Sequence, residues 1–202
     1  MMQLVIYIHG KGGSIEEAKH YKSLFPNADV IGFDYQSQTP WEAKKEFPVY
    51  YDMHSKGYDS VLLIANSIGA FFALSSLGNR RIAQAFFISP IVDMEELIRN
   101  MMTWAKVSEK ELSERKEIIT DFGETLSWEY LCYVKNNSID WQIPTYILYG
   151  DKDNLISQES ITQFSTKIGA DLTIMPGGEH WFHTEEQMHF LDAWIKRSRW
   201  IK

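Results

Sequence analysis

Residues 60–70 read SVLLIANSIGA, an aliphatic run that passes through Asn66 and Ser67 into small residues. The run up to Ala65 has the composition of a strand that is buried on both faces of a parallel sheet. Residues 71–77 read FFALSSL and are typical of a helix. A serine between such a strand and helix lies in a tight, strained turn, which needs small residues two positions before and after it. Ala65 and Gly69 supply them, so we expect Ser67 to stand on a nucleophile elbow.

Five other runs share this buried-strand character. All six runs are residues 4–8, 30–33, 60–65, 85–89, 145–149 and 172–175. Segments with helical periodicity separate them, and two of these begin with capping boxes, Ser14 with Glu17 and Thr39 with Glu42. Because parallel neighbours need a crossover, the alternation predicts an α/β fold with a mostly parallel, doubly wound sheet of about six strands. Ligands of such sheets bind at the carboxyl ends of the strands.

The segment from 91 to 143 interrupts the alternation. It shows no convincing strand but three helical stretches, with capping signals at Asp93 and Ser108 and a third helix over 128–134. We therefore predict a core made of residues 1–90 and 144–202 and a small helical cap inserted at 91–143. Large apolar side chains in this insertion, Met101, Trp104 and Trp128 among them, either pack the cap or line a substrate pocket.

Composition narrows the class of protein. The 202 residues carry 20 Lys and Arg against 27 Asp and Glu, a net charge of −7, and no basic run, so nucleic acid and anionic membranes are poor partners. No apolar stretch approaches the ~20 residues of a membrane span, and the N-terminal run lacks the features of a signal peptide. The single cysteine, Cys132, excludes an internal disulfide and fits a cytoplasmic protein. Its apolar neighbours indicate a packing role.

The first predicted strand ends in a glycine-rich turn, residues 9–14, with the sequence HGKGGS. Such a turn brings a backbone amide close to a bound oxygen, so we expect Lys11 and Ile68 to donate the two amides of an oxyanion hole. The turn could also cradle a phosphate. However, it lacks the ending of a P-loop, and its glycine spacing differs from the dinucleotide fingerprint.

An acid and a histidine follow the last two predicted strands. Asp153 comes after the strand 145–149 and His180 after the strand 172–175, so both should reach the sheet edge that carries Ser67. A serine needs a base to remove its proton, and a carboxylate that orients the base improves it. Three other acids compete with Asp153 for this role: Asp151, Asp93 and Asp34.

With its nucleophile, acid and histidine in this order and its His9-Gly10 loop, the sequence resembles the α/β-hydrolase superfamily from residue 9 to a final helix near 182–200. The resemblance implies Ser67 as nucleophile, His180 as base and Asp153 as acid, with the 91–143 insertion where members carry a cap. Two departures are visible: the first two strands of a full-length member are absent, and Ala65 replaces the commoner glycine of the elbow.

These features predict an enzyme without a cofactor, a serine hydrolase of carboxylic esters with small or medium acyl groups. A thioesterase or amidase would use the same three residues, and a catalytically silent binding protein would keep the same scaffold. His180, His183 and His189 also raise the question of a metal, but no Glu-x-x-His frame or cysteine set accompanies them, so none is expected.

Overall fold

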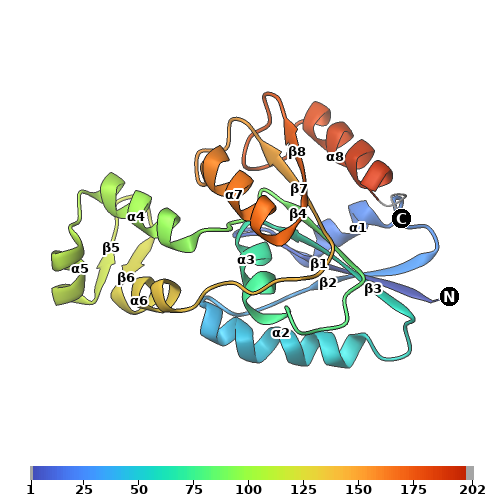
Figure 1. The fold of residues 1–202 in the computed structure, drawn as a ribbon, viewed down its shortest axis with the longest axis horizontal. Helices are drawn as coiled ribbons and strands as arrows, with labels where there is room; N and C mark the ends of the chain where they lie inside the picture. Colours follow the sequence, from blue (N-terminus) through green and yellow to red (C-terminus); the bar gives the residue numbers. More distant parts are fainter. Residues whose placement is uncertain (1, 199–202) are drawn as a thin grey trace. The chain divides into compact units, whose positions relative to one another are not determined.

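The computed structural model describes residues 2–198 of the chain, which divide into two compact units (Figure 1). The first unit consists of the residues up to Val92 and those from Asp140 onward, and the second of Asp93–Ile139. The sequence-based prediction placed the insertion at 91–143, slightly wider at both ends. The apolar residues at these margins, Ile91, Val92, Trp141 and Ile143, are buried, and Trp141 packs on Phe87 of the first unit, with ring centroids 5.6 Å apart.

The first unit is built on one parallel sheet of six strands in the order β2-β1-β3-β4-β7-β8. The strands are β1 (Gln3–Ile8), β2 (Ala28–Phe33), β3 (Ser60–Asn66), β4 (Gln84–Ile88), β7 (Thr145–Gly150) and β8 (Asp171–Met175). Every predicted strand is present, which confirms the predicted fold class. The run 145–149 is buried throughout because β7 has neighbours on both sides and helices on both faces.

Helices cover both faces of this sheet (Figure 1). On one face, α1 (Ala18–Tyr21) and α8 (Glu185–Ser198) contribute to an apolar core in which Trp194 meets Phe86 edge to face. On the other face, α2 (Pro40–His54) packs on α3 (Ser67–Ser76), and α7 (Gln158–Ile168) follows β7. None of the helices within residues 2–198 is long and apolar enough to cross a membrane.

The predicted helix starts are largely confirmed. Thr39 accepts a hydrogen bond from the Glu42 amide, and Pro40 occupies the first position of α2. Ser14 opens only a 3₁₀ turn, η1 (Ile15–Glu17), which runs into the single turn of α1. The final helix was expected to reach Trp200. That residue lies outside the described part of the chain, in which α8 ends at Ser198.

The strand order changes direction between β1 and β3. The chain leaves β1 for β2 on one side and then crosses to β3 on the other, so the loops after β1 and β3 diverge to opposite faces. Ile8 pairs with Ala65 at the ends of these strands, and the His9 loop therefore starts beside the Ser67 turn. This is the point of a doubly wound sheet where ligands bind.

The second unit contains α4 (Met94–Ala105), α5 (Glu109–Arg115) and α6 (Trp128–Asn136), in line with the three predicted helical stretches. The prediction that this segment lacks strands is wrong. An antiparallel pair, β5 (Glu117–Ile119) and β6 (Thr125–Ser127), joins α5 to α6. Each of these strands has three residues and buries only one of them, Ile118 or Leu126, so no alternating pattern is long enough to be recognised.

Candidate active site

Ser67 stands at the sharp turn between β3 and α3. Its φ is +49°, in the left-handed region that residues other than glycine rarely adopt. The neighbouring backbone explains why the turn keeps this shape: a Cβ on Gly69 would lie 2.2 Å from the His9 carbonyl oxygen. The small residue at 69 thus lets α3 approach the end of β1. The geometry matches the strained elbow expected from the sequence, with Ser67 itself as the first residue of α3.

His180 connects Ser67 to Asp153. Its Nε2 lies 2.8 Å from Ser67 Oγ, and its Nδ1 lies 2.6 Å from Asp153 Oδ2. Both distances are within hydrogen-bond range, so one imidazole bridges the hydroxyl and the carboxylate. The structure therefore brings together the three side chains that the sequence singled out, from the loops after β3, β7 and β8.

The Asp153 carboxylate is fixed by its surroundings. Its side chain is 1% exposed, and its second oxygen, Oδ1, accepts hydrogen bonds from the amides of Leu155 and Ile156 at 2.8 and 3.3 Å. The loops that carry Asp153 and His180 are joined through the backbone, since the Lys152 amide donates to the Gly178 carbonyl. A buried carboxylate with one oxygen on backbone amides keeps the other directed at the imidazole.

The competing acids have other partners. Asp151 accepts a hydrogen bond from the Gly177 amide at 2.7 Å and so closes the turn after β8. Asp93 accepts the Glu96 amide at 2.8 Å as the N-cap of α4. Asp34 is exposed after the end of β2. Local backbone geometry thus accounts for Asp151 and Asp93, whereas Asp153 directs an oxygen at His180.

The glycine-rich loop lies against the elbow. The Gly13 amide donates to the Gly10 carbonyl, which closes a turn around Lys11, and the Tyr35 hydroxyl donates to the His9 carbonyl at 3.0 Å. A Cβ on Gly10 would lie only 3.2 Å from Ser67 Cβ. Lys11 therefore follows a residue in contact with the elbow, and Ile68 belongs to the first turn of α3. Their amides remain our candidates for oxyanion donors.

Three residues beside the site were not predicted to have a role in it. Tyr7 on β1, Asn66 at the end of β3 and Glu17 in η1 form a continuous set of hydrogen bonds. The only signals in the sequence were a hydroxyl within the apolar run 4–8 and an amide next to Ser67. Because the sequence already explained Glu17 as part of a capping box, its contact with Tyr7 was not predicted.

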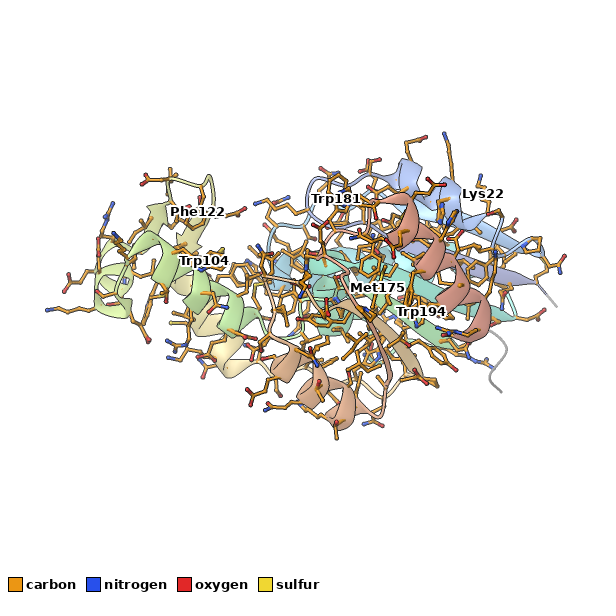
Figure 2. The ribbon with its side chains drawn as sticks, turned by 90° about the horizontal axis from the view of Figure 1, so that it is seen from above. Lys22, Trp104, Phe122, Met175, Trp181 and Trp194 are labelled. Atoms are coloured by element: carbon orange, nitrogen blue, oxygen red, sulfur yellow. The ribbon has the colours of Figure 1, made fainter. Side chains whose placement is uncertain are left out.

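His183 and Cys132 have ordinary surroundings. The His183 ring stacks on the exposed indole of Trp181 at 4.5 Å, and its Nδ1 lies 2.7 Å from the Trp181 carbonyl (Figure 2). Among residues 2–198, no group of three or more His, Cys, Asp or Glu side chains is arranged to hold a metal ion. Cys132 is a free thiol, half-buried on α6.

The predicted pocket residues lie in the second unit. Trp104 is 50% exposed and meets Phe122 edge to face at 6.2 Å (Figure 2), while Met101 and Trp128 are half-buried. None of the three is fully buried in the core of its own unit. Their part in substrate binding stays a prediction.

Comparison with known proteins identifies the fold. No protein-family model and no curated protein sequence matches the chain. Among solved structures, Est1E from Butyrivibrio proteoclasticus with bound ferulic acid superposes with a TM-score of 0.77 at 16% identity, covering 98% of this chain and 88% of that one. The mouse alpha/beta hydrolase domain-containing protein 10 superposes with a TM-score of 0.73 at 16% identity. This superposition covers 97% of this chain and 89% of that one. An esterase from Pyrococcus furiosus, Pf2001, superposes with a TM-score of 0.57 at 18% identity, covering 98% of this chain and 80% of that one. The chain therefore has the α/β-hydrolase fold.

Proposed function

We propose that this chain is a serine hydrolase that cleaves carboxylic esters of small or medium acyl groups through an acyl-enzyme on Ser67. The observation that carries the proposal is the bridge from Ser67 through His180 to Asp153, with contacts of 2.8 and 2.6 Å. A serine hydroxyl is a poor nucleophile without such a base, and a carboxylate on the far nitrogen holds the imidazole in the tautomer that accepts the proton.

Acylation follows from this geometry. Ser67 Oγ attacks the ester carbonyl carbon while its proton passes to His180 Nε2, and the carbonyl oxygen becomes an oxyanion. The amides of Lys11 and Ile68 donate to that oxyanion, and the N-terminal end of α3 adds its positive dipole. The tetrahedral intermediate collapses as the bond to the alcohol oxygen breaks. His180 returns the proton to this oxygen, and the alcohol leaves.

Deacylation uses the same groups with water in place of serine. A water molecule gives a proton to His180 Nε2 as its oxygen attacks the acyl carbon. The bond to Ser67 Oγ then breaks, His180 returns the proton to Oγ, and a carboxylic acid is released. Asp153 stays ionised in both halves and stabilises the imidazolium.

Esters are proposed as substrates because the fold neighbours include an esterase and a structure with bound ferulic acid, a carboxylic acid. The small size of the second unit, Asp93–Ile139, supports short or medium acyl groups, which a compact cap would cover without a long lipid groove. Met101, Trp104 and Trp128 are proposed to line the acyl pocket.

Hydrolysis of a p-nitrophenyl ester series from acetate to octanoate tests the proposal. Wild-type protein should release p-nitrophenol fastest from the short and medium esters, and Ser67→Ala should lower turnover by about 10⁶-fold. A matching thioester and anilide series separates esterase activity from thioesterase and amidase activity. Absence of Ser67-dependent turnover on all three series would favour a binding protein on the same scaffold.

A further inference from the structure

A hydrogen-bonded chain runs beneath the proposed site from the nucleophile elbow to the oxyanion loop. Asn66, the residue before Ser67, donates from Nδ2 to the Tyr7 hydroxyl at 2.9 Å, and this hydroxyl donates to the Glu17 carboxylate. Tyr7 is completely buried, whereas Glu17 is exposed. The buried Tyr7 hydroxyl thus links Asn66, next to the nucleophile, to the exposed carboxylate of Glu17.

The Glu17 carboxylate also holds the glycine-rich loop. Its second oxygen, Oε1, accepts a hydrogen bond from the Ser14 amide at 3.1 Å. A Cβ on Gly13 would lie 2.7 Å from the same oxygen, so the carboxylate packs directly against the backbone of this glycine. Glu17 therefore touches one end of the loop 9–14, and the Tyr35 hydroxyl holds the other end at the His9 carbonyl.

The direction of these hydrogen bonds is settled by charge. Burial, together with the neighbouring Tyr21 and Glu17, raises the pKa of Tyr7, so its hydroxyl keeps its proton. A protonated hydroxyl between an amide NH₂ and a carboxylate accepts from the first and donates to the second. Hydrogen bonds to a charged acceptor are roughly twice as strong as neutral ones, which makes Glu17 the strong end of the chain.

We propose that Glu17, acting through Tyr7 and Asn66, is a positioning residue that fixes the loop of residues 9–14 relative to the Ser67 elbow. The inference rests on the proposed function, in which Lys11 of this loop and Ile68 of the elbow donate to one oxyanion. Two donors on separate segments serve one oxygen only if the segments keep a fixed separation. Capping of η1 explains the contact between Glu17 and Ser14, but it does not explain the buried link to the residue before the nucleophile.

Two variants and one control test the inference. Tyr7→Phe removes the hydroxyl that joins Asn66 to Glu17, and Glu17→Gln replaces a carboxylate that accepts two hydrogen bonds with an amide that has one oxygen. Tyr51→Phe is the matched control, because Tyr51 is also buried and its hydroxyl donates to a backbone carbonyl, that of Arg81, away from the site. The melting temperature of each variant is recorded alongside its kinetics.

Both variants should lower kcat for p-nitrophenyl acetate by about 10-fold to 100-fold, the range for a slightly misplaced catalytic group, with KM changed less than about twofold. Affinity for a trifluoromethyl ketone, which forms an oxyanion on the attacking serine, should fall by the same factor as kcat. The double variant should lose little more than the worse single variant, because both changes break one chain. Tyr51→Phe should lower only the melting temperature.

Hydrogen exchange gives a readout that does not depend on turnover. The amides of residues 9–14 should exchange faster in both variants than in wild-type protein, and Tyr51→Phe should leave them unchanged. If kcat falls no further than in Tyr51→Phe, or if loop exchange is unaltered, the inference is overturned while Ser67-dependent hydrolysis by wild-type protein stands. If wild-type protein shows no Ser67-dependent hydrolysis, the proposed function fails, and the positioning role fails with it.

Discussion

His180 Nε2 lies 2.8 Å from Ser67 Oγ, although 113 residues separate the two in the chain. They meet because β3 and β8 run parallel in one sheet, so the loops after both strands leave from the same edge. β4 and β7 lie between these strands in the sheet, and the loop after β8 must reach back across the ends of both. The buried Asp153, on the loop after β7, holds His180 along this path.

The acid assignment is tested by a pair of amide variants two residues apart. Asp153→Asn should lower kcat by about 10⁴-fold, because an amide favours the wrong tautomer of His180. Asp151→Asn is the matched control, since its carboxylate accepts the Gly177 amide and an amide oxygen can do the same. Equal losses in the two variants would show that Asp153 is not the acid.

Asp93 is expected to act on stability and not on catalysis. Asp93→Ala removes the N-cap of α4 and should lower the free energy of unfolding by about 1 kcal/mol, measured by urea titration. Asp93→Asn keeps a capping oxygen and should preserve both stability and kcat. If Asp93→Asn lost more turnover than Asp153→Asn, the carboxylate that supports His180 would be Asp93 and not Asp153.

The elbow depends on the absence of a side chain at position 69. Gly69→Ala places a methyl group 2.2 Å from the His9 carbonyl oxygen, a backbone atom that moves only with the end of β1. We expect a loss of about 1–3 kcal/mol in the free energy of unfolding together with a loss of turnover. Ser75→Ala on the same helix removes only a bond to the Phe71 carbonyl and should cost about 1 kcal/mol with kcat unchanged. A Gly69→Ala protein with wild-type stability would contradict the packing described.

The apolar residues of the second unit should set acyl preference. Trp104→Ala and Trp128→Ala should change the ratio of octanoate to acetate hydrolysis, because each methylene in an apolar pocket is worth about 1–3 kcal/mol. Leu131→Ala is the control, since Leu131 is fully buried in the same unit and should lower only the melting temperature. Unchanged ratios in both tryptophan variants would leave these side chains with a packing role alone.

The sequence was most informative where physical constraints act locally. The central strands β1, β3, β4 and β7 are buried almost throughout and are therefore apolar along most of their length, which made them visible in the sequence. The edge strands β2 and β8 are only partly buried, but they too are short apolar runs between loops. Ser67, Asp153 and His180 follow such strands, so their meeting at one sheet edge could be predicted.

What escaped prediction depends on contacts between segments. The strands β5 and β6 bury one residue each, and their pairing becomes evident only in three dimensions. The contact of Tyr7 with Glu17 and Asn66 joins three elements, and the sequence shows each of these residues with a sufficient local role of its own. The choice among Asp151, Asp93 and Asp153 likewise required knowing which group is hydrogen-bonded to each carboxylate, and only the structure shows this.

Covalent labelling with a fluorophosphonate tests the central claim most directly. This reagent phosphonylates a serine only when a base activates it, and peptide mass spectrometry locates the adduct. We predict one adduct on Ser67 of the folded wild-type protein, none at this position in Ser67→Ala, and strongly slowed labelling in His180→Gln. An adduct on a different residue, or no adduct on folded wild-type protein, would contradict the account.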